Sequence, residues 1–203
     1  MCLPRSSTAR AVSGGVAACS DSHAAPSRAI KTAGPSYRGL LAASPELAAR
    51  FPASRTLLLP HGADIAHFGR PATIAEDLSR GRPVAGFYGS ISDWLDVSLL
   101  AHTARGLPDW DFLLIGEVRT NVDALRGLPN VRLVGARDHG DLPAYVQHWQ
   151  VSLLPFRDTP QIRACNPLKL REYLAAGTPI VSTPFPALRP YLDLVEVVPS
   201  AAG

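Results

Sequence analysis

The sequence predicts an α/β fold in which a Rossmann-like parallel sheet carries helices on both faces. The first observation is a series of short segments that are apolar throughout, among them residues 112–115 and 151–154. The second is that these segments alternate with segments whose apolar residues recur at helical spacing. Strands without polar alternation are buried on both faces, and strands that alternate with helices form parallel sheets.

The expected elements begin near Tyr37. Ser44 is a good N-cap and Pro45 suits the first helical position, so we expect a short helix that ends at Arg50. The next elements are a strand, a turn and a linker, at residues 56–59, 60–64 and 71–82. From there the regular alternation starts, with strands expected at residues 84–89, 112–115, 131–134, 151–154, 180–183 and 195–198. Two helices between these strands are expected at residues 94–104 and 141–149.

The stretch NPLKLREYLAAGTPIVST, residues 166–183, predicts a further helix followed by a buried strand. We expect Asn166 as the N-cap, Pro167 at the first helical position and Gly177 in the left-handed conformation that ends the helix. The free N–H groups at the start of a helix favour phosphate, and Glu172 farther along could accept hydrogen bonds from ribose. The alternative interpretation is an ordinary surface helix in which Lys169 and Glu172 form an ion pair.

Three segments are predicted: a weakly ordered segment 1–36, a helix, strand and linker at 37–81, and a Rossmann-like domain at 82–203. The first segment is rich in Ala, Ser, Gly and Pro and lacks a periodic apolar pattern. The chain of 203 residues is 46% hydrophobic and 18% charged, which is typical of a globular protein. No apolar run approaches a membrane span, so we expect a cytoplasmic protein with at most peripheral membrane contact.

The net charge and the pattern of charged residues limit the classes of ligand that the chain could bind. A formal charge of +3 suits a phosphate-bearing ligand, but no basic run with interleaved aromatic residues indicates nucleic acid. Three widely spaced cysteines and scattered histidines, His67 and His139 among them, show no metal-ligand or catalytic spacing, so we expect no metal site. We expect these histidines on the surface or in core packing.

Several predicted strands end at a glycine. Ligands of open parallel sheets bind at the carboxyl ends of the strands, where glycines let a ligand approach the backbone closely. The positions that converge at this edge are Gly89, Gly116, Gly135, Phe156 and the start of the helix at residue 166. A dinucleotide site would need G-x-G-x-x-G after a strand, whereas the first strand here reads G-F-Y-G-S-I.

The blocks VAGFYGSISDWLD, DFLLIGEV, LPNVRLVG, LPAYVQHWQVSLLPFR and NPLKLREYLAAGTPIVST, in this order, resemble the C-terminal half of the group-one glycosyl transferases of GT-B fold. The resemblance begins with the block LLLPHGADIAHF, covers roughly residues 57–196, and makes segment 82–203 a nucleotide-sugar-binding domain. It implies a nucleotide diphosphate sugar as donor substrate, no cofactor, no metal, and retention of configuration. It also implies transfer of the sugar to an acceptor glycan or lipid-linked sugar, in surface polysaccharide or glycoconjugate synthesis.

The resemblance also implies roles for individual residues. Glu172 would bind the ribose hydroxyls, and Lys169 would add charge beside the diphosphate. The other residues implied in donor binding are Asn166, Leu168 and Leu170 on the helix, Gly89, Ser90 and Ile91 in the first turn, Gly116, the base-pocket residues Gly135, Ala136 and Arg137, and Arg157. No catalytic residue is assigned.

Some positions depart from the family pattern. Ala164 stands where the family often has a second glutamate, and the Gly89 turn lacks the usual Arg and Lys, whose charge Arg157, Arg163 and Lys169 could supply instead. We also expect the N-terminal acceptor domain to be missing and the fold to be truncated. Two alternatives therefore stay open: a nucleotide-sugar-binding module without its own catalysis, and a GT-B sugar-nucleotide epimerase.

Overall fold

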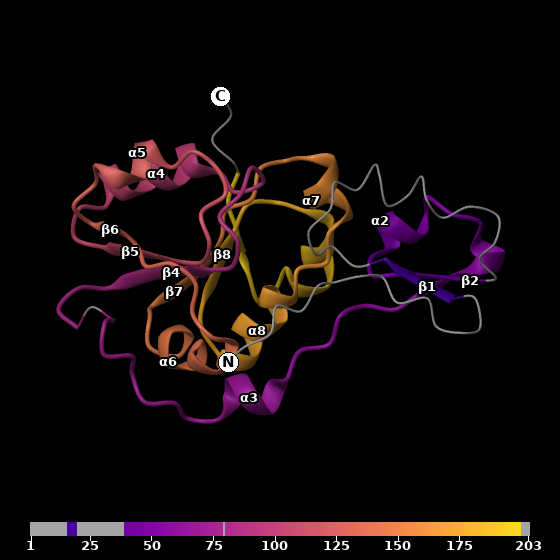
Figure 1. The fold of residues 1–203 in the computed structure, drawn as a ribbon, viewed down its shortest axis with the longest axis horizontal. Helices are drawn as coiled ribbons and strands as arrows, with labels where there is room; N and C mark the ends of the chain where they lie inside the picture. Colours follow the sequence, from indigo (N-terminus) through magenta and orange to yellow (C-terminus); the bar gives the residue numbers. More distant parts are fainter. Residues whose placement is uncertain (1–15, 20–38, 79, 200–203) are drawn as a thin grey trace. The chain divides into compact units, whose positions relative to one another are not determined.

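The computed structural model describes residues 16–19, 39–78 and 80–199 (Figure 1). The chain divides into two compact units. The first contains the described residues up to His61 together with Arg163–Asn166, and the second contains Gly62–Ile162 and the described residues from Pro167 onward. The segment boundaries predicted at residues 36 and 81 stay predictions, and most of segment 1–36 lies outside the described residues.

The first unit holds a three-stranded parallel sheet in the order β1-β2-β3. Its strands are β1 (Val16–Cys19), β2 (Gly39–Ala42) and β3 (Thr56–Leu58). Helix α2 (Pro45–Ala48) and the 3₁₀ helix η1 (Ala53–Arg55) lie between β2 and β3. The Oγ of Ser44 accepts a hydrogen bond from the N–H of Leu47 and donates one to the carbonyl of Ala164, so the predicted N-cap is confirmed.

The second unit is built on a six-stranded parallel sheet in the order β6-β5-β4-β7-β8-β9. Its strands are β4 (Val84–Tyr88), β5 (Asp111–Ile115), β6 (Val131–Leu133), β7 (Val151–Leu154), β8 (Ile180–Ser182) and β9 (Glu196–Val197). The sheet grows outward from β4 in one direction and then from β7 in the other, which is the doubly wound order. The predicted α/β class with a parallel sheet is confirmed.

Helices cover both faces of this sheet (Figure 1). Helices α4 (Val97–Gly106) and α5 (Asp123–Arg126) lie on one face, and α6 (Pro143–Val146) and α8 (Leu168–Ala176) lie on the other. Helix α3 (Ile65–Gly69) packs against α8 and α6. The remaining short helices are η2 (His139–Asp141), α7 (Pro160–Ala164) and η3 (Pro186–Tyr191).

The core of the second unit is centred on β4, whose five residues are all buried. Trp149 lies flat against this strand at Gly86, where a Cβ atom would come within 1.9 Å of the indole Cε3. The indole N–H donates to the Oγ of Ser152 in β7, so the burial of its polar group is compensated. This packing fixes α6 and the residues after it against the carboxyl half of the sheet.

The structure corrects the predicted start of α8. Asn166 is not the N-cap; that position is taken by Pro167, with extended ψ of 126° and no side-chain cap. The Asn166 amide instead donates to the carbonyl of Ala43, 2.7 Å away, within the first unit. The predicted end is confirmed, because Gly177 has φ of 74° and its backbone N–H donates to carbonyls of the last turn of the helix.

Other predicted bounds shift by a few residues. Helix α4 starts at Val97 because Asp96 accepts a hydrogen bond from the N–H of Leu99, whereas the prediction started at residue 94. The predicted helix 141–149 is shorter, with its helical core at Pro143–Val146. Helices α3, α5 and α7 were not predicted. In the part of the chain that the structure describes, no helix has both the length and the hydropathy of a membrane span.

Candidate functional site

The loops that follow β4, β5 and β6 lie side by side at the carboxyl edge of the large sheet. The N–H of Gly89 donates to the carbonyl of Ile115, and the N–H of Gly116 donates to the carbonyl of Gly135, both at 2.8 Å. The N–H of Ile91 continues the pattern with the carbonyl of Glu117 at 2.9 Å. The three glycines expected at this edge are therefore brought together by the backbone itself.

Each of these glycines has a positive φ, and two of them stand where a side chain would clash. A Cβ on Gly116 would lie 1.9 Å from the carbonyl oxygen of Gly89. A Cβ on Gly89 would lie 2.9 Å from Cε of Lys169. Glycine at these positions thus lets two loops and the first turn of α8 approach one another closely.

Lys169 places its ammonium group beside the turn after β4. Its Nζ lies 5.4 Å from the ring centroid of Phe87 and 5.7 Å from that of Phe156, within the range of cation–π contacts. Phe87 belongs to β4 and Phe156 follows β7, and these neighbouring strands flank the point where the sheet reverses its direction of growth. Ligands of doubly wound sheets bind at this point.

Glu172 is a buried carboxylate in the second turn of α8, with a side chain that is 6% exposed. Its Oε2 accepts a hydrogen bond from the hydroxyl of Tyr88 at 2.6 Å, and its Oε1 lies 3.3 Å from Nε2 of His139. Burying a carboxylate is costly unless hydrogen bonds replace its hydration. The described donors use only part of the acceptor capacity of the two oxygens, which is about four hydrogen bonds.

One histidine, His139, contacts this carboxylate from its exposed side, and a second, His67, packs against His139. The His139 side chain is 59% exposed and stacks on His67 of α3 with ring centroids 4.9 Å apart. Both rings contact Phe68 edge-on. The sequence prediction missed these histidines as neighbours of Glu172. The position of His139 shortly after the β6 loop was a usable signal, whereas nothing in the sequence marks His67, which lies on a helix of five residues.

Ser90 adds a polar group at the turn after β4. Its Oγ is buried and has no hydrogen-bond partner among the described residues. An unsatisfied buried hydroxyl costs about 1–3 kcal/mol, so such groups are rare in folded proteins. The resemblance implied a role for Ser90 in donor binding, and that role stays a prediction.

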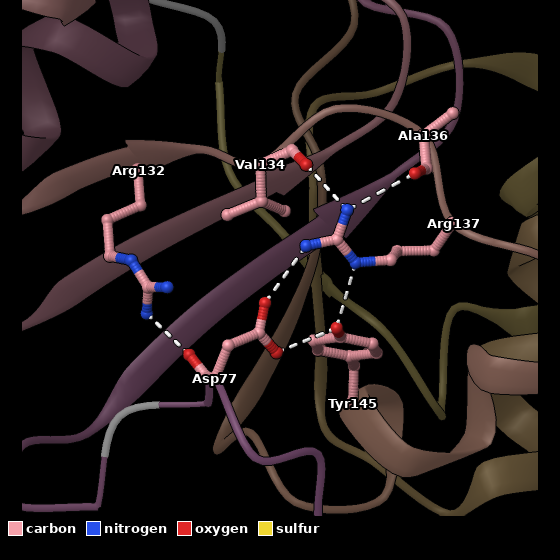
Figure 2. A network of polar contacts seen from close by, with 6 residues as sticks. All are labelled: Asp77, Arg132, Val134, Ala136, Arg137 and Tyr145. Carbon is pink, nitrogen blue, oxygen red and sulfur yellow. Dashed lines mark hydrogen bonds and ion pairs between the residues drawn. The ribbon is translucent and has the colours of Figure 1, made fainter.

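Arg137 is engaged in a network of its own (Figure 2). Its guanidinium donates to the hydroxyl of Tyr145, the carboxylate of Asp77 and the carbonyls of Val134 and Ala136. Tyr145 also donates to Asp77 at 2.7 Å. Burial raises the pKa of Asp77, but the hydrogen bonds from Tyr145 and Arg137 and the charge of Arg137 together lower it by more. The pKa of Asp77 therefore lies below its ordinary value of 3.8.

This network bears on the predicted base pocket. Figure 2 shows the Arg137 guanidinium turned toward Asp77 and Tyr145, where it ties residues 75–78 to the loop after β6. Arg132 holds the same segment through the carbonyl of Asp77, at 2.7 Å. Gly135 and Ala136 are exposed beside it. Contacts of these three residues with a base stay predictions.

The remaining predicted residues differ in their surroundings. Ile91 and Leu170 are fully buried apolar side chains, so only their backbone could reach a ligand. Leu168 is 40% exposed at the start of α8. The backbone N–H of Arg157 donates to the carbonyl of Trp94, and its side chain is exposed. Asn166 belongs to the first unit.

The fold and this edge together define a doubly wound α/β domain whose glycine turns, ammonium group and buried carboxylate gather at the reversal point of the sheet. The family model of the glycosyl transferases group 1 matches residues 82–196. The chain therefore belongs to the group 1 glycosyl transferases. No group of side chains among the described residues is arranged to hold a metal ion.

Comparison with individual proteins agrees with this family. The chain is 39% identical over 108 residues to TuaH of Bacillus subtilis (strain 168), whose name assigns it provisionally to teichuronic acid biosynthesis as a glycosyltransferase. That match covers 51% of this chain and 27% of TuaH.

Two solved structures share the fold. One is Anabaena HepE in complex with UDP-glucose, with a TM-score of 0.67 and 17% identity, covering 86% of this chain and 53% of HepE. The other is sucrose-phosphate synthase from Thermosynechococcus elongatus, with a TM-score of 0.66 and 20% identity, covering 86% of this chain and 48% of the synthase. The chain thus spans about half the length of the solved structures it matches.

Proposed function

We propose that this chain forms the donor-binding half of a retaining, metal-independent glycosyltransferase. The donor is a nucleoside diphosphate sugar, and the acceptor is a glycan or lipid-linked sugar in surface polysaccharide synthesis, bound by a further domain. The name of TuaH supports the polysaccharide, and the UDP-glucose bound to HepE supports the donor class. A cytoplasmic location with at most peripheral membrane contact is part of the same proposal.

One observation carries the proposal: Glu172 is buried beside the reversal point of the sheet and keeps acceptor capacity toward its exposed side. In the proposed complex its carboxylate accepts hydrogen bonds from ribose hydroxyls. The diphosphate lies along the Gly89 turn, where the ammonium group of Lys169 and the unsatisfied hydroxyl of Ser90 meet it. Fixed dipoles and a cation would stabilise the leaving diphosphate without a metal.

The test is a calorimetric titration of the 203-residue chain with UDP and with GDP. We expect one of them to bind, and Glu172→Gln to weaken that binding about 10–100-fold, because hydrogen bonds to a charged group contribute about 1.5–3 kcal/mol. The matched control is Glu196→Gln, at an exposed position in β9, with unchanged affinity expected. Absence of binding by both nucleotides, or equal binding by Glu172→Gln, would overturn the donor site.

Transfer is tested separately, because the chain spans about half the length of the solved structures it matches. UDP-glucose and GDP-mannose are incubated with the chain, and release of the nucleoside diphosphate is followed by chromatography. We expect binding without turnover, which makes these residues a donor-binding module. Turnover by these residues alone would contradict that expectation and would leave the donor site itself intact.

A further inference from the structure

The Glu172 carboxylate is oriented by one short hydrogen bond from the sheet. The phenol of Tyr88, the last residue of β4, donates to Oε2 at 2.6 Å, which is the length typical of a hydroxyl bonded to a carboxylate. The only other described contact of the carboxylate is with the exposed His139, at 3.3 Å. Of the two contacts that the Glu172 carboxylate makes with described residues, the one with Tyr88 is therefore the shorter and the more buried.

Tyr88 itself has little freedom to move. It is 5% exposed, and its ring meets Tyr173 edge-on at 4.9 Å and stacks at 6.3 Å on both Phe68 and Trp149. Burial raises the pKa of this phenol, and Tyr173 and Glu172 raise it further, so the hydroxyl keeps its proton and remains a donor. The hydrogen bond to Glu172 thus comes from a closely packed ring whose hydroxyl is protonated at neutral pH.

The carboxylate needs such a partner, because the last torsion of a glutamate side chain has a broad and nearly flat preference. With Oε2 held on the buried side by Tyr88, Oε1 is turned toward the exposed side, where His139 lies. Oε1 is then the oxygen available to an incoming hydroxyl group.

We propose that Tyr88 is a positioning residue of the nucleotide site, which fixes the Glu172 carboxylate so that Oε1 accepts the ribose hydroxyls. This inference rests on the proposed function, since it names the group that makes Glu172 selective for ribose. The competing explanation is that the Tyr88 hydroxyl only stabilises the fold. The two explanations differ in whether removing the hydroxyl acts through the ribose hydroxyls of the ligand.

Tyr173 provides a matched control. Its side chain is at least as deeply buried as that of Tyr88, and its hydroxyl accepts a hydrogen bond from the Tyr88 backbone N–H at 3.2 Å, but no described hydrogen bond links it to the Glu172 carboxylate. Tyr173→Phe therefore removes one buried hydroxyl from the same ring cluster while leaving the carboxylate with its donor. Tyr88→Phe removes the donor and keeps the ring.

The experiment compares the nucleotide that binds in the titration above, UDP or GDP, with its 2′,3′-dideoxy form. We expect the full 203-residue chain to prefer the ribonucleotide by about 10-fold or more, because unpaired buried polar groups penalise the analogue. We expect Tyr88→Phe to reduce this preference to about 3-fold or less. Tyr173→Phe is expected to keep the original preference, even if both affinities fall. Unfolding midpoints of all variants are measured alongside.

A double variant tests independently whether Tyr88 acts through Glu172. If Tyr88 acts through Glu172, adding Tyr88→Phe to Glu172→Gln changes the ribose preference by less than 2-fold, whereas independent roles would give the full reduction again. A Tyr88→Phe variant that keeps the full preference overturns the inference and leaves the proposed function standing. A chain that binds neither nucleotide, or binds the ribo and dideoxy forms equally, overturns the proposed function and the inference with it.

Discussion

Gly116 packs directly against the backbone of Gly89: a Cβ atom added to Gly116 would lie 1.9 Å from the Gly89 carbonyl oxygen. The φ of Gly116 is +150°, which side-chain-bearing residues rarely adopt. Gly116→Ala therefore combines a clash with backbone atoms and a strained dihedral. We expect it to lower the free energy of unfolding by about 2–4 kcal/mol, measured by urea unfolding.

The matched control for this change is Gly127→Ala. Gly127 follows α5 with φ of −87° and ψ of 0°, and no atom lies within 4 Å of the position its Cβ would take. We expect this variant to be as stable as the native chain or up to about 1 kcal/mol more stable, because alanine restricts the unfolded state. Equal stability of the two variants would show that the loops after β4 and β5 do not pack as described.

The role of Lys169 is testable with a ligand that lacks phosphate. Lys169→Met keeps the apolar stem beside Phe87 and Phe156 and removes the ammonium group. If the ammonium group meets the diphosphate, affinity for the bound nucleoside diphosphate falls about 10-fold and loses part of its salt dependence. Affinity for the corresponding nucleoside stays unchanged, as measured by the same titration.

Arg105→Met serves as the control for the loss of one positive charge. Arg105 lies on α4, and its guanidinium donates to the carbonyl of Ala124 at an exposed position. We expect no more than a 2-fold change in nucleotide affinity from this variant. An equal loss of nucleoside and nucleoside diphosphate binding in Lys169→Met would instead mean that Lys169 shapes the site without contacting phosphate.

The Asp77 network predicts a pH-dependent contribution to stability. Because the pKa of Asp77 is lowered in the folded chain, its contribution is fully present above the ordinary value of 3.8 and is lost as pH falls through the folded pKa. The side chains of Asp77 and Arg137 are 37% and 31% exposed, so solvent screening limits the ion pair. We expect Asp77→Asn to cost about 0.5–1 kcal/mol at pH 7.

The measurement is the difference in unfolding free energy between the native chain and Asp77→Asn, from pH 7 down to pH 3. That difference should shrink below about pH 4, because the carboxylate of the unfolded chain then takes up protons while that of the folded chain, whose pKa is lower, still carries its charge. Asp123→Asn is the control, because its ion pair with Arg126 is 3.8 Å long and well exposed, and a change below about 0.3 kcal/mol is expected at every pH. A constant difference for Asp77→Asn would mean that the charge of Asp77 contributes nothing.

The large sheet was predictable from the sequence because its central strands β4 and β5 are almost entirely buried. A strand such as β4 has no charged or amide side chain, so its apolar run stands out between Pro83 and Gly89. The gathering of Gly89, Gly116 and Gly135 at one edge followed from the parallel topology alone. The helices α3, α5 and α7 were missed because helices of four or five residues are too short to show a period.

The surroundings of Glu172 were only half predictable. Its own place on α8 follows from the helix pattern, but the partners Tyr88 and His139 come from elements 84 and 33 residues away in sequence. In the sequence, Tyr88 is the last residue of an apolar run, and nothing in that run indicates which group its hydroxyl will contact. Such contacts depend on how elements pack, which periodicity does not encode.

Asn166 is the clearest case in which a local rule gave the wrong role. Asn before Pro suggests an N-cap, where the side-chain oxygen accepts a hydrogen bond. In the structure the amide nitrogen donates to the carbonyl of Ala43 at 2.7 Å in a buried setting. Asn166→Asp separates these roles, because aspartate caps a helix as well as asparagine but has no amide to donate.

We expect Asn166→Asp to lower the free energy of unfolding by about 1–3 kcal/mol at pH 7, since a carboxylate would face a carbonyl oxygen that has lost its donor. Asn121→Asp is the matched control: its side-chain oxygen accepts from the N–H of Asp123 at 2.8 Å, a role that aspartate can also fill. That variant should change stability by less than about 0.5 kcal/mol. If Asn166→Asp is tolerated equally well, then Asn166 acts as an acceptor at the start of α8, and its amide contact with Ala43 contributes nothing to stability.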